Sequence, residues 1–205
     1  MENTSKLYFY PVWLRVWHGI NAIGIILLII TGFSMQAGDA NSLIPFNTLV
    51  SVHNISGLIV SLNYFVYIIG NVVTKNSRFY IIKPKNLIKR PLKQVQYYAF
   101  GMFKGMKKPY PLSEKRKFNP LQKYAYVGTM YLVVPVVIAT GFALLFPETI
   151  IETVYNLSGI LLTAVLHSVT GFFVFIFLLI HLYVASIGES PRENFKSIIN
   201  GWHHV

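Results

Sequence analysis

The stretch VLHSVTGFFVFIFLLIHLYV, Val165 to Val184, decides the fold class of this chain. It contains no charged side chain, yet it carries two histidines, His167 and His181, fourteen positions apart. As a helix with a rise of about 1.5 Å per residue, it would cross the hydrocarbon core of a bilayer, which is about 30 Å thick. Ionisable groups are costly at that depth, so two imidazoles in this stretch indicate a function.

The composition of the whole chain agrees with a membrane protein. Of 205 residues, 54% are hydrophobic and only 12% are charged, whereas soluble domains contain about 25% charged residues. The absence of cysteine excludes disulfides, thiolate-bound zinc, iron–sulfur clusters and haem attached through C-x-x-C-H. The length suits a single domain over residues 1–205, and no internal repeat is apparent.

Four apolar segments are long enough to be transmembrane helices, at about residues 13–35, 48–73, 121–146 and 158–187. None shows the short alternating pattern of barrel strands, so the predicted fold is an all-α bundle of four transmembrane helices. The first segment is longer than the apolar core of a signal peptide, and no A-x-A site follows it. We therefore expect it to remain as a span.

The basic residues predict the orientation of the bundle. They lie near the two termini and between Lys75 and Lys123, whereas loops 36–47 and 147–157 contain none. The acidic residues of these two loops are Asp39, Glu148 and Glu152. By the positive-inside rule, both termini and the long loop 74–120 are cytoplasmic. The net charge of +11 then serves insertion and contact with anionic lipid, and no nucleic-acid partner is expected.

Part of the long loop is amphipathic. The stretch NLIKRPLKQVQYYAFGMFKGMKKPYP, Asn86–Pro111, interleaves aromatic, Leu, Val and Met side chains with Lys and Arg. This pattern predicts an interfacial helix lying on the membrane. The alternative is a helix face that docks a soluble partner.

Four of the six histidines lie in the spans or at their ends: His18, His53, His167 and His181. In the predicted orientation, His53 and His167 lie near the outer face, and His18 and His181 near the inner face. Fourteen residues place His181 about 21 Å below His167, within about 40° of the same helix face. The sequence therefore predicts two pairs, His53/His167 and His18/His181, each suited to ligate the iron of one haem b.

Small residues follow each of these histidines by one helical turn: Ala22, Gly57, Gly171 and Ala185. They would leave clearance for a flat macrocycle, although small residues also simply let helices pack closely. Arg15, one turn before His18, is a candidate partner for a haem propionate or a snorkelling anchor. His203 and His204 lie in the polar tail, and we expect them not to be ligands.

Several motifs resemble one family of membrane subunits: PVWLRVWHGINA at 11–22, VHNISG at 52–57, KFNPLQKYAY at 117–126, and H-x13-H followed by GESPRENFKSIINGW at 188–202. The chain resembles, over nearly its whole length, the four-helix di-haem cytochrome b subunits of formate dehydrogenases, nickel–iron hydrogenases and thiosulfate-reductase-like enzymes. The likeness is greatest to the thiosulfate-reductase-type branch, which has a similar long basic loop and tail.

The resemblance implies the same two axial pairs in a subunit of the bacterial cytoplasmic (inner) membrane. It also implies a site for menaquinone or ubiquinone near His181 and the start of the third span, with Asn119 and Gln122 as candidate contacts. From the residues alone, Asn119 followed by Pro120 indicates a helix N-cap, and both roles stay open.

The expected function is electron transfer between the quinone pool and a catalytic or electron-transfer subunit, containing iron–sulfur clusters or several haems, that docks at the outer face. The first alternative is a stand-alone quinone-reducing cytochrome that oxidises a small species such as superoxide. A histidine-based transporter of divalent metal is less favoured, because the spans contain hardly any carboxylate. The least favoured is an anchor whose histidines only bond between helices.

Overall fold

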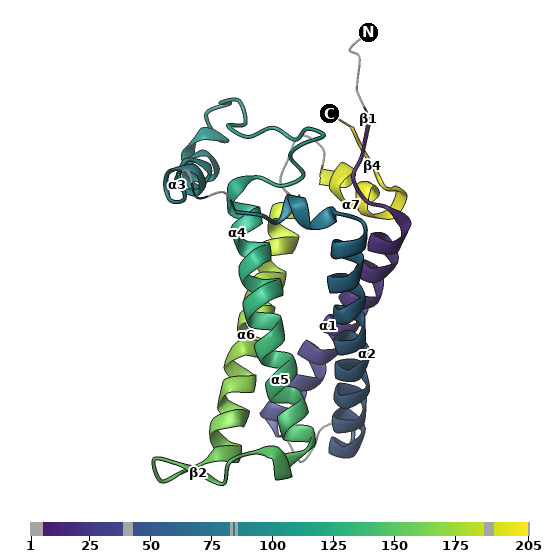
Figure 1. Cartoon of the computed structure of the whole chain (residues 1–205), viewed down its shortest axis with the longest axis vertical. Coiled ribbons are helices and arrows are strands. Elements are labelled where there is room, and N and C mark those ends of the chain that lie inside the picture. Colours follow the sequence, from purple (N-terminus) through teal and green to yellow (C-terminus); the bar gives the residue numbers. More distant parts are fainter. Residues whose placement is uncertain (1–5, 39–42, 83, 85, 187–190, 205) are drawn as a thin grey trace.

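The computed structural model describes residues 6–38, 43–82, 84, 86–186 and 191–204, and within them four long helices stand side by side (Figure 1). Three of them are single elements: α1 (Val12–Ala37), α2 (Phe46–Val73) and α6 (Gly159–Ser186). The other long helix, third along the chain, consists of α4 (Pro120–Gly128), a π-helical turn η3 (Thr129–Val133) and α5 (Val134–Leu145). All four are long and apolar enough to cross a membrane, which confirms the expected mostly helical bundle. Their ends lie within two residues of the predicted bounds. The predicted end of the last span, Ile187, lies outside the described residues, and so does Asp39 of the first predicted outer loop.

The π-helical turn in the third span has a local cause. Pro135, the second residue of α5, has no backbone N–H, and its ring crowds the carbonyl one turn earlier. The wider turn at Thr129–Val133 moves that carbonyl away, so the helix continues without a break in the apolar segment.

The bundle consists of two helical hairpins, α1 with α2 and α5 with α6. In the first, Gly24 allows close approach: a Cβ there would lie 2.4 Å from Cγ2 of Val60. Two reciprocal hydrogen bonds join the same helices, since Trp17 Nε1 donates to the carbonyl of Asn63 (2.9 Å) and Asn63 Nδ2 donates to the carbonyl of Trp17 (3.0 Å). The buried side-chain nitrogens of Trp17 and Asn63 are thus satisfied between the two helices, as an apolar surrounding requires.

The described parts of both chain ends lie at one end of the bundle (Figure 1). There β1 (Lys6–Tyr8) pairs antiparallel with β4 (Trp202–His204), which follows α7 (Pro191–Asn200). Gly201, with φ +90°, makes the turn between α7 and β4, and its carbonyl accepts the backbone N–H groups of Phe9 and Tyr10. These contacts attach the C-terminal tail to the start of α1.

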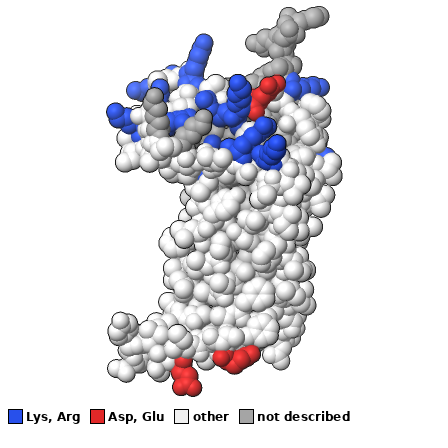
Figure 2. All heavy atoms as spheres, viewed as in Figure 1, with Lys and Arg blue, Asp and Glu red and all other residues white. Residues whose placement is uncertain are grey.

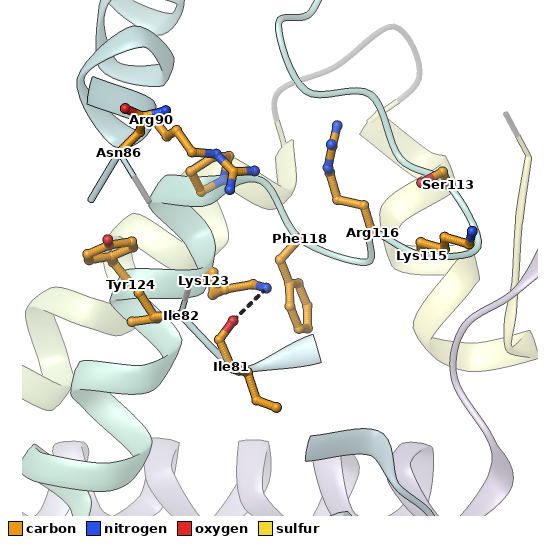
Figure 3. A pocket seen from close by; sticks show the side chains of 11 residues that line it. Ile81, Ile82, Asn86, Arg90, Ser113, Lys115, Arg116, Phe118, Lys123 and Tyr124 are labelled. Atoms are coloured by element: carbon orange, nitrogen blue, oxygen red, sulfur yellow. Dashed lines mark hydrogen bonds between the residues drawn. The ribbon is translucent and has the colours of Figure 1, made fainter. Parts of the chain in front are cut away.

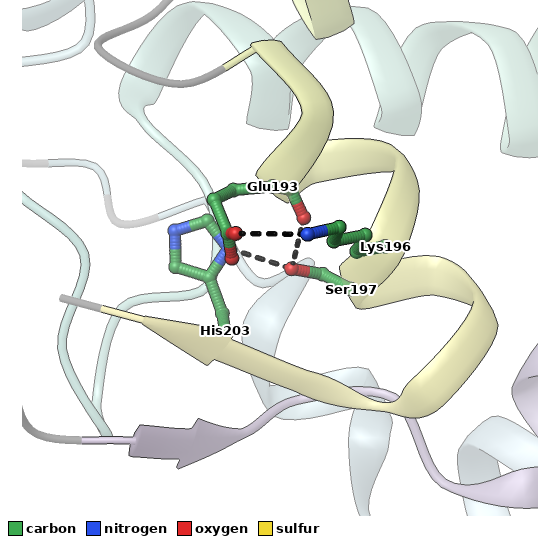
Figure 4. Close-up of polar contacts among 4 residues, drawn as sticks. All are labelled: Glu193, Lys196, Ser197 and His203. Atoms are coloured by element: carbon green, nitrogen blue, oxygen red, sulfur yellow. Dashed lines mark hydrogen bonds and ion pairs between the residues drawn. The ribbon is translucent and has the colours of Figure 1, made fainter.

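His203 has a structural place in this tail (Figure 4). Its Nδ1 lies 2.9 Å from the hydroxyl of Ser197, which donates to the carbonyl of Glu193 (2.6 Å). The carboxylate of Glu193 in turn lies 4.0 Å from Lys196 Nζ. His203 therefore belongs to a hydrogen-bond network within the tail, around the buried Ser197, and lies outside the bundle interior.

The middle segment lies at the same end and contains η1 (Asn76–Phe79), α3 (Lys89–Gln96) and a π-helical turn η2 (Tyr97–Gly101). The expectation of an interfacial helix over the whole of 86–111 is wrong in extent, because helix is confined to 89–101. Gly105 has φ +66°, and prolines at 109 and 111 prevent continuation. The helical part exposes apolar side chains, namely Leu92, Val95 and Phe100, as a membrane-surface segment would.

Charge divides the molecule into two ends (Figure 2). We call the end with α3, α7 and the clustered Lys and Arg side chains the basic end. The opposite, hairpin end holds η4 (Pro147–Thr149) and the short strands β2 (Thr153–Val154) and β3 (Leu157–Ser158). Among the described residues, its charged side chains are Glu148 and Glu152. This asymmetry is the one on which the predicted orientation rests.

Candidate haem-ligand sites

The four histidines of the spans meet in the bundle as the two predicted pairs. His53 of α2 faces His167 of α6 toward the hairpin end, with ring centres 6.2 Å apart and an interplanar angle of 71°. His18 of α1 faces His181 of α6 toward the basic end, with the same 6.2 Å separation and an angle of 52°. Each pair joins the α1/α2 hairpin to α6.

The separation of the rings fits a shared metal atom. An imidazole nitrogen lies about 2.0 Å from a bound metal ion and about 1.1 Å from its own ring centre, so two imidazoles on opposite sides of one iron have ring centres about 6.2 Å apart. Both pairs have this spacing. It is too long for a direct hydrogen bond between the rings' near nitrogens, which would bring the centres about 1 Å closer.

A threonine on the neighbouring helix holds each histidine of the hairpin-end pair. Nδ1 of His53 lies 2.9 Å from Oγ1 of Thr31 on α1, and Nδ1 of His167 lies 3.0 Å from Oγ1 of Thr140 on α5. Each threonine hydroxyl also donates to a carbonyl four residues earlier in its own helix, at 2.7 Å from Leu27 and 2.8 Å from Val136. These four bonds form the same pattern twice, once in each helical hairpin.

The hydrogen-bond directions determine the imidazole tautomer. Because each threonine proton is used for a backbone carbonyl, the hydroxyl oxygen must accept the proton on Nδ1. Nε2 then keeps its lone pair and can ligate iron, which is the arrangement that outer partners impose on metal-binding histidines. Each helical hairpin therefore orients its own ligand through a bond within that hairpin.

Glycines next to these threonines give the rings room. A Cβ at Gly141 would lie only 3.1 Å from Cε1 of His167, and a Cβ at Gly32 would lie 3.6 Å from Cε1 of His53. The small residues singled out in the sequence lie elsewhere: a Cβ at Gly57 would meet Leu28 at 3.8 Å, and one at Gly171 would meet nothing within 4 Å. Gly171 therefore borders open space beside His167, in accord with clearance for a flat ligand.

The basic-end pair has an aromatic surrounding. The ring of Phe177 stacks on His181 at 5.8 Å and 14°, and the Tyr126 hydroxyl lies 3.4 Å from Nδ1 of His181. Trp17, beside His18, stacks on the buried ring of Tyr67 at 4.6 Å. The hydrogen bond at His181 is longer than those at the hairpin end, so its orientation depends more on ring packing.

Arg15 lies near the basic-end pair but has a partner that the sequence did not suggest. Its Nη1 donates to the carbonyl of Ile199 in α7, while its Nε is buried without a partner. Arg15 therefore fastens the C-terminal tail to α1 and keeps one buried donor that an anionic group such as a propionate would satisfy.

Asn119 and Gln122, the candidate quinone contacts, form a capping box at the start of α4. Asn119 Oδ1 accepts the backbone N–H of Gln122 at 2.9 Å, and Gln122 Oε1 accepts that of Asn119 at 3.1 Å. Asn119 Nδ2 also donates to the Tyr98 hydroxyl at 2.9 Å. The capping role is present, and the amide nitrogen of Gln122 is left over for a further acceptor.

Lys117, two residues before Asn119, has a side chain that is only 3% exposed. Among the described residues, no carboxylate lies beside it. Its Nζ lies 3.5 Å from Oδ1 of Asn76 and 4.6 Å from the ring centre of Tyr10. Burial lowers the pKa of Lys117 to about 7, and burial also raises the pKa of Tyr10 to about 12. The basic end therefore contains a buried amine that exchanges its proton near neutral pH.

Sequence reasoning missed Thr31, Thr140 and their glycines, although a short signal was present. The tripeptide T-G-F occurs at 31–33 and 140–142, in each case on the helix beside a histidine. It also occurs at 170–172, where the Thr170 hydroxyl donates to backbone carbonyls of its own helix. Three residues are too few to register as a repeat, and only the fold shows which copies face imidazoles.

The geometry gives no support to the metal-transport alternative. Within the described part of the chain, no three His, Cys, Asp or Glu side chains come together as a metal site. The histidines meet in twos at separate depths, an arrangement that suits one haem with two imidazole ligands at each depth.

Comparison with known proteins points to one family. Residues 9–201 match the family described as prokaryotic cytochrome b561. The chain is 32% identical over 206 residues to "Putative cytochrome YdhU" of Escherichia coli strain K12, covering 98% of this chain and 76% of that protein. It is 27% identical to "Probable Ni/Fe-hydrogenase B-type cytochrome subunit" of Rhodobacter capsulatus, and 26% identical to a protein of the same name from Bradyrhizobium diazoefficiens.

The two hydrogenase subunits align with 70% and 67% of this chain. The chain covers 56% and 57% of their own length, a little over half. No solved structure gives a significant match.

Proposed function

Because this chain belongs to the prokaryotic cytochrome b561 family, and is thus a b-type cytochrome with transmembrane helices, we propose that it carries electrons between a partner oxidoreductase and the membrane quinone pool. Two haems b would be held by His53 with His167 and by His18 with His181. Haem supplies the one-electron chemistry when it is bound, and the chain fixes the ligands, their tautomers and the dry surroundings.

The observation that carries the proposal is the pair of 6.2 Å ring separations, each joining α6 to the α1/α2 hairpin. Because His167 and His181 lie on one helix about 21 Å apart, they define a path along the bundle from the hairpin end to the basic end. At the hairpin end, Thr31 and Thr140 keep the ligating nitrogens free of protons.

We place the quinone at the basic end, beside the start of α4. Tyr126 of α4 lies against His181, and one turn earlier Gln122 offers its amide nitrogen as a donor to a quinone carbonyl. Asn119, held against Tyr98, would position that donor and could itself contact the quinone. Lys117, buried at the same end, is a group that can hold and release a proton there.

We assign the basic end, with both termini, to the cytoplasm of a bacterial cell and the hairpin end to the outer face. The Lys and Arg clustered at one end, opposite Glu148 and Glu152, support this orientation (Figure 2). Reduction of quinone by electrons from outside, with proton uptake inside, would then separate charge across the membrane. Turnover in sealed vesicles without a membrane potential would contradict that step.

We assign the partner, a catalytic or electron-transfer subunit, to the hairpin end. Tyr155 is almost fully exposed at the β2–β3 turn, with Ile151 and Leu157 exposed beside it. Two relatives are named as cytochrome subunits of hydrogenases, which supports a partner of this kind. We place the chain in the thiosulfate-reductase-type branch because of its long basic middle segment and tail.

The test is electron transfer through the purified chain. The haems are reduced with dithionite, the excess reductant is removed anaerobically, a menaquinone analogue is added, and haem oxidation is followed by stopped-flow absorbance. We expect quinone to oxidise the haems of wild type rapidly. His181→Ala should lack the basic-end haem and should therefore lose the rapid oxidation. His167→Ala should keep the basic-end haem, which quinone should still oxidise rapidly. Equal rates with and without quinone would refute the quinone role, and turnover of superoxide without a partner would favour the stand-alone alternative.

A further inference from the structure

A cavity of about 230 Å³ at the basic end has no part in the proposed electron path (Figure 3). It lies between the middle segment and the start of α4. Among the described residues that line it, four side chains are cationic and none is Asp or Glu. These four are Arg90, Lys115, Arg116 and Lys123.

Neutral groups orient the two arginines of this basic cavity. The guanidinium groups of Arg90 and Arg116 each lie 5.5 Å from the ring centre of Tyr110. Lys123 Nζ also donates to the carbonyl of Ile81 at 3.3 Å. Aromatic faces and carbonyls orient cations without neutralising their charge. Like charges gathered in this way repel one another, and an anion placed among them would remove that repulsion.

The rest of the lining is amphipathic. Ile81, Ile82, Phe118 and Tyr124 supply an apolar wall, while the Ser113 hydroxyl and the Asn86 amide lie among the cations. The cavity lies beside the first residues of α4, where this helix begins its candidate membrane span, and this is the depth of lipid headgroups. A free inorganic anion would use only the cations, whereas a phospholipid would use the apolar wall as well.

We propose that this basic cavity binds the headgroup phosphate of one anionic phospholipid, with its acyl chains beside Ile81 and Ile82. Arg90 and Arg116 would donate charge-assisted hydrogen bonds to the phosphate oxygens, and Ser113 would bond the polar end of the headgroup. A zwitterionic lipid brings an ammonium group that these cations repel. The site requires neither haem nor quinone, and it does not depend on which face of the membrane is cytoplasmic.

The test is a lipid titration of the purified, delipidated holoprotein in non-ionic detergent, with bound lipid counted by native mass spectrometry. We expect one phosphatidylglycerol per chain, and affinity about tenfold or more lower in the double variant Arg90→Gln/Arg116→Gln. The matched control removes two exposed charges of the same segment outside the cavity, Lys104→Gln/Lys107→Gln, and should change affinity less than about twofold. An unchanged visible haem spectrum shows that each variant is folded.

Equal losses in the two double variants would overturn the proposal, because they would show attraction by overall charge alone. Binding of phosphatidylcholine as tightly as phosphatidylglycerol would also overturn it. Displacement of the lipid by millimolar inorganic phosphate would identify a free-phosphate site instead. If the arginine variant does not fold, Lys115→Gln/Ser113→Ala serves in its place. Its affinity for phosphatidylglycerol should be about threefold lower than that of wild type. An unchanged affinity in this variant would equally overturn the proposal.

Discussion

Thr31→Val tests how the hairpin-end haem is held. Valine keeps the shape of threonine but removes the oxygen that lies 2.9 Å from Nδ1 of His53. A buried N–H left without an acceptor costs about 1–3 kcal/mol, which corresponds to roughly 5- to 150-fold in an equilibrium constant. Loss of a partner that orients a metal ligand usually costs about 10- to 100-fold, so the two estimates agree.

We therefore expect haem at the hairpin end to bind about 10- to 100-fold more weakly in Thr31→Val, while haem at the basic end is retained. The assay transfers haem from the purified protein to excess apomyoglobin and follows the Soret absorbance, where the two haems of one chain give separate phases. The remaining hairpin-end haem should also have a higher midpoint potential, because an imidazole without this bond is a weaker donor to ferric iron.

Two further variants make the test specific. Thr31→Ser keeps the hydroxyl and should behave like wild type. Thr170→Val removes a hydroxyl of the same T-G-F motif that donates only to backbone carbonyls, so it should leave both phases unchanged. If Thr31→Val and Thr170→Val lose haem equally, or if neither loses it, the tautomer argument is wrong.

Three other changes have definite expected outcomes. Gly141→Ala should weaken the hairpin-end haem more than Gly32→Ala in the same haem-transfer assay, because the added Cβ lies 3.1 Å from an imidazole carbon in the first case and 3.6 Å in the second; the reverse order would contradict this. The free energy of unfolding of wild type in detergent should increase as the pH rises from 7 toward 10. Burial lowers the pKa of Lys117 to about 7 in the folded protein, whereas in the unfolded chain the amine keeps its proton up to about pH 10.5. This rise, on the order of 4 kcal/mol, should be absent in Lys117→Met, and a rise of equal size in both would show that Lys117 is not its source. Asn119→Ala should lower the free energy of unfolding by about 1 kcal/mol through loss of the N-cap, whereas Asn119→Asp should not. If Asn119 also contacts quinone, both variants should slow quinone-dependent haem oxidation; a wild-type rate in Asn119→Asp would limit Asn119 to capping.

The helices and the meeting of the histidines could be predicted because both depend on simple periodic rules. Hydropathy over about 20 residues locates a span, and the fourteen-residue spacing of His167 and His181 follows from the helical repeat. The positions of His18 and His53 along their own spans then placed His18 at the depth of His181 and His53 at the depth of His167. The structure brings these residues together in the same pairs.

The partners of the histidines could not be predicted in the same way. Thr31 and Thr140 lie on different helices from the imidazoles they hold, so only the rotation of one helix against its neighbour brings them into contact. The sequence also gave no reason to expect Lys117 inside the fold, because a single lysine in a basic segment is usually solvated. The extent of α3 was overestimated since amphipathic composition continues past Gly101, whereas the backbone turns at Gly105.

The most direct measurement is the haem content of the purified chain, by pyridine haemochrome assay together with the reduced-minus-oxidised visible spectrum. We predict two non-covalent haems b per chain with low-spin spectra, and one haem in each of His167→Ala and His181→Ala. A chain that binds no haem when expressed with sufficient haem, or single variants that keep both haems, would contradict the two-pair arrangement.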